Sequence, residues 1–79
     1  MFEERVATAN GIFVELVFLP AAGYRLSCRK EKNMLVEYKS DGKRHRRMVL
    51  GRESAYEFKS VEKLRYDFER DAEDAQRQA

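Results

Sequence analysis

Apolar and polar residues alternate along the first two thirds of the chain, which predicts a series of β-strands. The first apolar run is β-branched and aromatic and is interrupted only by Glu15, as in a strand covered on both faces. The next run alternates cleanly, with apolar side chains on one side and Arg25, Ser27 and Arg29 on the other. The predicted strands cover residues 11–19, 23–30, 33–39 and 43–50, with a short fifth candidate at 55–58.

The C-terminal third changes to a helical period. Ser60 is a suitable N-cap, and apolar residues then recur at steps of three and four along one stripe. The stripe consists of Val61, Leu64, Phe68, Ala72 and Ala75. We therefore expect a helix over residues 60–77 and an α+β fold: a four- or five-stranded antiparallel sheet with one long C-terminal helix packed across it, in a single domain of residues 1–79.

The register of the last hairpin depends on its loop. A two-residue loop, Asp41-Gly42, would set the cation of Arg47 opposite Val36 on the core side. A three-residue loop, with Gly42 in the left-handed conformation, pairs Met34 with Met48 instead. The second register is favoured, because it gathers the apolar residues on one face: Met34, Val36, Tyr38, Met48 and Leu50.

Charge is distributed unevenly along the 79 residues. Residues 24–52 hold ten cations and three anions, residues 1–23 hold one and three, and residues 53–79 hold five and eight. The net charge of +2 therefore hides a basic middle between two mildly acidic ends. The single cysteine, the acidic start and the lack of a long apolar stretch predict a cytoplasmic protein without a membrane span.

The residue types needed for catalysis or metal binding are scarce. The only histidine lies among arginines that oppose its protonation, and Cys28 and His45 are too few for a zinc site. The four glycines are isolated, so no phosphate-binding glycine loop is present. These observations predict a protein that is not an enzyme, with no catalytic residues, no metal and no cofactor.

The basic middle centres on one hairpin, residues 39–47. Like charges packed on a two-stranded arm destabilise it, and bound phosphates or carboxylates would relieve this. The candidate binding residues for nucleic acid or an acidic protein surface are Lys39, Lys43, Arg44, His45, Arg46, Arg47, Arg25 and Arg29. Phe13 and Tyr56 are the aromatic residues expected to be free for base stacking, so backbone contact is favoured over base readout. The alternative is a solubilising hairpin that protects a sheet edge.

Two resemblances bear on the partner. Antiparallel strands followed by a long helix resemble single-stranded-DNA-binding proteins of the transcriptional-coactivator and whirly kind, in architecture alone. The segment EFKSVEKLRYDF, residues 57–68, is similar to the strand-to-helix entry of a small phage-encoded anti-CRISPR inhibitor of the type I-F class. The similarity lies in Phe58, Ser60, Glu62, Leu64 and Phe68. It implies a non-enzymatic phage protein that binds a CRISPR surveillance complex.

The function expected from the residues is a small nucleic-acid-binding module that grips the backbone with its basic hairpin. The alternative is a phage or mobile-element inhibitor that binds an acidic or nucleic-acid-binding surface of a partner complex. Val17 and Leu19 lie on the second face of their strand, and if that face is uncovered, a homodimer is expected.

Overall fold

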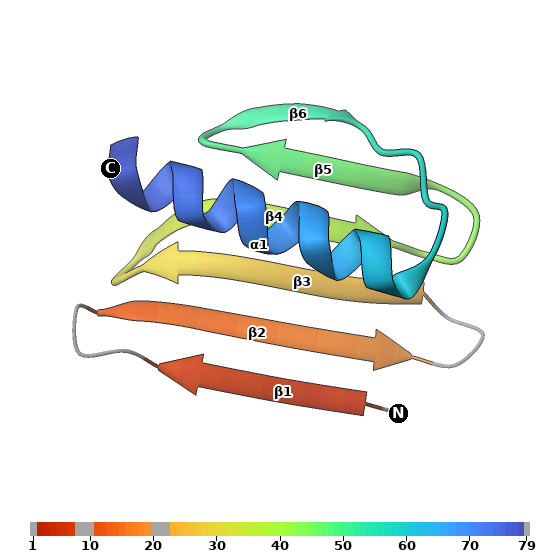
Figure 1. Ribbon diagram of the computed structural model, residues 1–79, viewed down its shortest axis with the longest axis horizontal. Coiled ribbons are helices and arrows are strands. Elements are labelled where there is room, and N and C mark those ends of the chain that lie inside the picture. Colours follow the sequence, from red (N-terminus) through yellow and green to blue (C-terminus); the bar gives the residue numbers. More distant parts are fainter. Residues whose placement is uncertain (1, 8–10, 20–22, 79) are drawn as a thin grey trace.

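The computed structural model describes residues 2–7, 11–19 and 23–78, which form an antiparallel sheet with a helix across one face (Figure 1). The six strands lie in sequence order, so each pairs with the next. The α+β class is confirmed. The elements are β1 (Phe2–Ala7), β2 (Ile12–Leu19), β3 (Gly23–Lys30), β4 (Asn33–Ser40), β5 (His45–Val49), β6 (Arg52–Ala55) and α1 (Val61–Gln78).

The sheet has six strands rather than the four or five expected. β1 was not predicted, because three of its six residues are charged and its apolar alternation is weak. It forms one edge of the sheet through its pairing with β2. The last strand ends at Ala55 rather than occupying residues 55–58. Pro20, which follows the first predicted strand in the sequence, lies outside the described residues.

The core lies between α1 and the face of the sheet that it covers, here called the inner face (Figure 1). The opposite side is the outer face. The largest of the fully buried side chains in the core are Leu26, Cys28, Val36, Tyr38, Leu64 and Phe68. The predicted helix stripe is buried apart from Val61, which is 48% exposed in the first turn. The Ser60 cap is present, since its Oγ accepts a hydrogen bond of 3.1 Å from the Lys63 backbone N–H.

A bulge between β3 and β4 changes the expected alternation. Cys28 pairs with Val36 but Arg29 pairs with Met34, so Leu35 is the extra residue. Leu35 is consequently 4% exposed, whereas Met34 lies beside Arg29 on the outer face. The prediction that Met34 faces the core is wrong for this reason.

The hairpin of β4 and β5 has neither of the two registers considered. Tyr38 pairs with Arg47 and Ser40 with His45, which leaves a four-residue loop, residues 41–44, here called the hairpin tip. Gly42 has a positive φ of 99°, as expected. The inner side of β5 therefore consists of His45, Arg47 and Val49, and the prediction that Met48 and Leu50 lie there is wrong.

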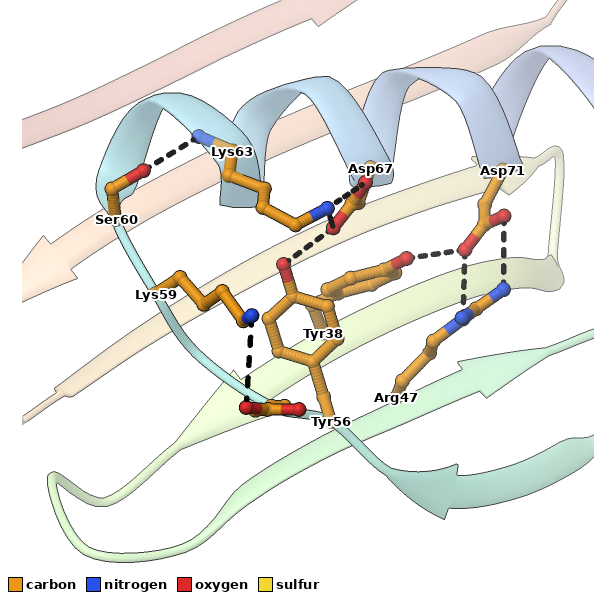
Figure 2. A network of polar contacts seen from close by, with 9 residues as sticks. Tyr38, Arg47, Tyr56, Lys59, Ser60, Lys63, Asp67 and Asp71 are labelled. Carbon is orange, nitrogen blue, oxygen red and sulfur yellow. Dashed lines mark hydrogen bonds and ion pairs between the residues drawn. The ribbon is translucent and has the colours of Figure 1, made fainter.

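An inward arginine is tolerated because α1 supplies its partner. Arg47 Nε lies 2.8 Å from Asp71 Oδ2, and its Nη2 donates to Asp71 Oδ1 at 3.1 Å (Figure 2). The guanidinium also lies over the ring of buried Tyr38, 5.8 Å from its centroid, and the Tyr38 hydroxyl donates to the same Asp71 carboxylate. The cation of Arg47 thus has two partners on the inner face, the Asp71 carboxylate and the Tyr38 ring. The strand pattern alone does not reveal either partner.

A second tyrosine ties the segment after β6 to the same helix. The Tyr56 hydroxyl donates to Asp67 Oδ2 at 2.7 Å, and Lys63 Nζ lies 3.2 Å from that oxygen (Figure 2). Burial raises the pKa of Asp67, but the hydrogen bonds from Tyr56 and Lys63 outweigh it and leave this pKa below its ordinary value. No helix in the described part of the chain has both the length and the hydropathy needed to cross a membrane.

Candidate nucleic-acid interface

The sheet separates the eight candidate residues into three groups. Two of them lie on the inner face: Arg47 pairs with Asp71 of α1, and His45 shares a hydrogen bond with Tyr24. Lys43 and Arg44 belong to the hairpin tip. The remaining four lie on the outer face: Arg25, Arg29, Lys39 and Arg46.

Three of the outer cations form a row across neighbouring strands. Arg25 on β3 is directly opposite Lys39 on β4, and Lys39 is directly opposite Arg46 on β5. Directly opposite residues have Cα atoms only about 5 Å apart, so like charges at these positions repel. We call these three residues the cation row. It crosses the sheet at the end where the hairpin tip projects (Figure 1).

Two carboxylates partly balance the cation row. Glu37 Oε2 lies 3.1 Å from Arg25 Nε, and its Oε1 lies 3.9 Å from Lys39 Nζ. Glu53 on β6 lies 2.7 Å from Arg46 Nη1, and this contact lowers the pKa of Glu53. The three cations keep at least half of their side-chain surface exposed: 59% for Arg25, 56% for Lys39 and 50% for Arg46.

The hairpin tip is held in shape by its own side chains. Asp41 Oδ1 accepts hydrogen bonds of 2.9 Å from the backbone N–H groups of Lys43 and Arg44. Ser40 Oγ accepts one of 2.9 Å from the Gly42 N–H. The bonds from the Arg44 and Lys43 amides lower the pKa of Asp41, so the carboxylate that shapes the tip is ionised at neutral pH.

Lys43 and Arg44 are the exposed cations that this shaped tip presents. Among the described residues, neither has a carboxylate within ion-pairing distance. The tip borders two open hollows of about 540 and about 400 Å³, and both are lined by Arg44 and Arg46. The larger one also includes Lys43 and His45, and the smaller one includes Lys39.

Arg29 does not join this group. It lies four residues from Arg25 along β3, about 13 Å at the usual strand rise, and Ser27 separates the two on the outer face. Its guanidinium is 5.2 Å from the ring centroid of Phe13, which is 40% exposed. The structure therefore places Arg29 with an aromatic residue rather than with the cation row.

His45 lies in an aromatic cluster beneath the tip. Its Nδ1 shares a hydrogen bond of 2.9 Å with the Tyr24 hydroxyl, and its ring is stacked on Phe58 at 5.2 Å with an interplanar angle of 9°. Burial raises the pKa of Tyr24 to about 12. Phe58 is 37% exposed and was not among the predicted site residues. No local pattern marks it, because the stack joins residues 13 positions apart.

The other side chains considered for chemistry are accounted for in the fold. Cys28 is fully buried on the inner face, and burial raises the pKa of its thiol despite an opposing hydrogen bond from Gln76. Tyr56, expected to be free, is half-buried and donates its hydroxyl hydrogen to Asp67. No grouping of three or more His, Cys, Asp or Glu side chains placed for a metal ion occurs among residues 2–7, 11–19 and 23–78.

Comparison with known proteins identifies no relative, since no family model, curated protein or solved structure matches this chain. The resemblance of residues 57–68 to the anti-CRISPR inhibitor stays a prediction.

Proposed function

We propose that this protein is a non-enzymatic module that binds the phosphate backbone of nucleic acid with its hairpin tip and cation row. The observation that carries the proposal is the pair Lys43 and Arg44, exposed on a shaped loop without an ion-pair partner among the described residues. A loop already ordered by Asp41 loses little conformational freedom when it binds. The site is narrower than the sequence predicted: Arg25, Lys39, Lys43, Arg44 and Arg46.

The charge balance at this end of the sheet supports an anionic ligand. Five cations face three carboxylates, those of Glu37, Asp41 and Glu53. Phosphate oxygens would neutralise the excess and would relieve the repulsion within the cation row. The two open hollows leave space beside Arg44 and Arg46 for such groups.

A second candidate is an acidic surface on a protein partner, as in the inhibitor hypothesis. The observation that favours it is that the cation row already binds carboxylates, at 3.1 Å for Arg25 and 2.7 Å for Arg46. The same guanidinium geometry suits carboxylate and phosphate. Free nucleic acid distinguishes the two candidates, because only the first predicts that it binds.

The test measures the salt dependence of oligonucleotide binding by fluorescence anisotropy. We expect Lys43→Ala/Arg44→Ala to weaken binding to every sequence and to reduce the slope of log K against log salt by about 0.7 per lost contact on single strands. The matched control is Lys32→Ala/Arg52→Ala, which removes one exposed lysine and one exposed arginine from the opposite end of the sheet. The control is expected to keep the wild-type slope.

An equal loss of slope in the two double variants would show that only net charge matters and would refute the site. Wild-type protein without salt-sensitive binding would refute the function and favour the acidic protein partner.

Light scattering on the same samples addresses the homodimer by separating the 9.3 kDa chain from its dimer. Leu19 is 39% exposed on the outer face, and Glu15 and Arg25 interrupt the apolar area around it.

A further inference from the structure

An exposed aromatic surface lies directly beside the hairpin tip. The rings of His45 and Phe58 are nearly parallel, with an interplanar angle of 9° and a centroid separation of 5.2 Å. Tyr24 supports both from the core side, 5.6 Å from His45 and 5.8 Å from Phe58, and is only 7% exposed. Phe58 is 37% exposed, so the cluster is open to solvent through this ring.

The cluster is continuous with the cations of the tip. His45 follows Arg44 in the chain and lines the larger hollow together with Lys43 and Arg44. Phe58 belongs to the segment between β6 and α1, which passes the tip at the same end of the molecule (Figure 1). His45 is one residue, about 3.8 Å along the backbone, from Arg44, and the exposed ring of Phe58 lies 5.2 Å beyond the His45 ring.

We infer that Phe58, backed by His45, is a stacking site for an unpaired base, and that the ligand of the hairpin tip is single-stranded nucleic acid. This inference rests on the proposed function. Single-strand-binding proteins combine a positively charged surface along the backbone with aromatic rings on which bases stack. Bases inside a duplex are stacked on one another, so an exposed ring beside the phosphates discriminates against a duplex.

Two other exposed aromatic residues are placed unsuitably for this role. Phe13 is 40% exposed on the outer face, but the Arg29 guanidinium lies over its ring, and Glu15 and Glu37 lie on the same face towards the cation row. Tyr66 is 61% exposed on α1, where its neighbours one turn away are of mixed charge: Glu62, Lys63, Glu69 and Arg70. Phe13 is therefore the natural control, with the same side chain and nearly the same exposure as Phe58.

The experiment compares two labelled oligonucleotides of about 12 nucleotides, within the usual range of site sizes. One is oligothymidine and the other is an abasic strand with the same number of phosphates. Wild-type protein should bind oligothymidine about fivefold to a hundredfold more tightly, since only its bases can stack. Phe58→Leu should bring this ratio close to one and leave the salt slope unchanged. Phe58→Trp should restore the ratio, and Phe13→Leu should not alter it.

The outcomes separate the two proposals. Salt-sensitive binding with equal affinity for the two strands would refute the stacking site and leave the backbone-binding function standing. A ratio lost in Phe13→Leu and kept in Phe58→Leu would also refute the site. Absence of salt-sensitive binding to either strand would refute the proposed function itself. Thermal unfolding of Phe58→Leu checks that the fold is intact, and recovery by Phe58→Trp excludes a loss caused by misfolding alone.

Discussion

At the scale of single residues, Leu50 has a conformation that leucine seldom adopts. Its φ is 49°, and Gly51 follows with 84°, so both residues of the turn between β5 and β6 have positive φ. Type I′ hairpin turns require this conformation and favour asparagine followed by glycine. A branched side chain in the left-handed region costs about 1–2 kcal/mol. The Leu50 N–H, which donates to the Leu35 carbonyl at 2.8 Å, helps to hold the turn in place.

We therefore expect Leu50→Asn to raise the free energy of unfolding by about 1 kcal/mol, because asparagine tolerates the left-handed region. Urea denaturation measures the change. Leu19→Asn is the matched control, since Leu19 is also 39% exposed but lies in a strand, where asparagine is unfavourable. A loss of stability in both variants would mean that the apolar contacts of Leu50 outweigh its backbone strain.

At the scale of elements, α1 and β5 are joined by an ion pair that satisfies the inward-facing Arg47. Asp71 has a side chain that is only 15% exposed, and it accepts hydrogen bonds from Arg47 and from the buried Tyr38 hydroxyl. Removal of this carboxylate leaves a buried hydroxyl and a half-buried guanidinium without an acceptor. Each unsatisfied buried group costs about 1–3 kcal/mol.

We expect Asp71→Ala to destabilise the protein by at least about 1 kcal/mol in urea denaturation. Asp74→Ala is the control, because Asp74 lies on the same helix, is 51% exposed and, within the described part of the chain, pairs only with exposed Arg77 at 3.5 Å. Its effect should stay within about 0.5 kcal/mol. Equal losses in the two variants would contradict a specific role for Asp71 and would point to helix propensity or charge instead.

The ion pair between Arg47 and Asp71 also shows why the sequence could predict some elements and not others. The helix follows from a local period and a cap, and Leu64, Phe68, Ala72 and Ala75 are buried as expected. The register of β5 is likewise predicted from the strand's own residues, on the assumption that a cation does not face the core. That rule fails where a distant element supplies the counter-charge, because Arg47 and Asp71 are 24 positions apart. The exposure of Lys43 and Arg44, in contrast, could be predicted, because the turn residues next to them in the sequence place them at the end of a hairpin.

At the scale of the whole molecule, the fold sorts the charges of the basic middle by face. On the inner face Arg47 is neutralised by an acid of α1, and Arg65 of α1 lies 3.8 Å from Glu4 of β1. On the outer face and at the tip the cations exceed the carboxylates beside them. The acids Asp71 and Glu4 thus tie α1 to β5 and to the edge strand β1, whereas the exposed cations of the basic middle lie on the outer face, at the hairpin tip and at the opposite end of the sheet.

The fold also buries the phenols of Tyr24 and Tyr38 and half-buries that of Tyr56, which predicts a loss of stability at alkaline pH. Burial raises the pKa of Tyr24 from 10.0 to about 12, and burial together with the acids of α1 raises the pKa of Tyr38 and of Tyr56 further. Because these pKa values are higher in the folded than in the unfolded chain, the unfolded state loses protons first. The stabilising contribution is complete below pH 10 and falls as the pH rises towards 12 and beyond.

We expect the urea midpoint to fall steadily above pH 10, the unfolded pKa of tyrosine, with phenolate absorbance and loss of helical circular dichroism appearing together. Tyr66→Phe removes the fourth and exposed phenol, so the absorbance of this variant reports only Tyr24, Tyr38 and Tyr56. The variant should show one coincident transition. Ionisation of these phenols while the circular dichroism is unchanged would mean that solvent reaches them in the folded chain, and that α1 does not close the inner face as the structure shows.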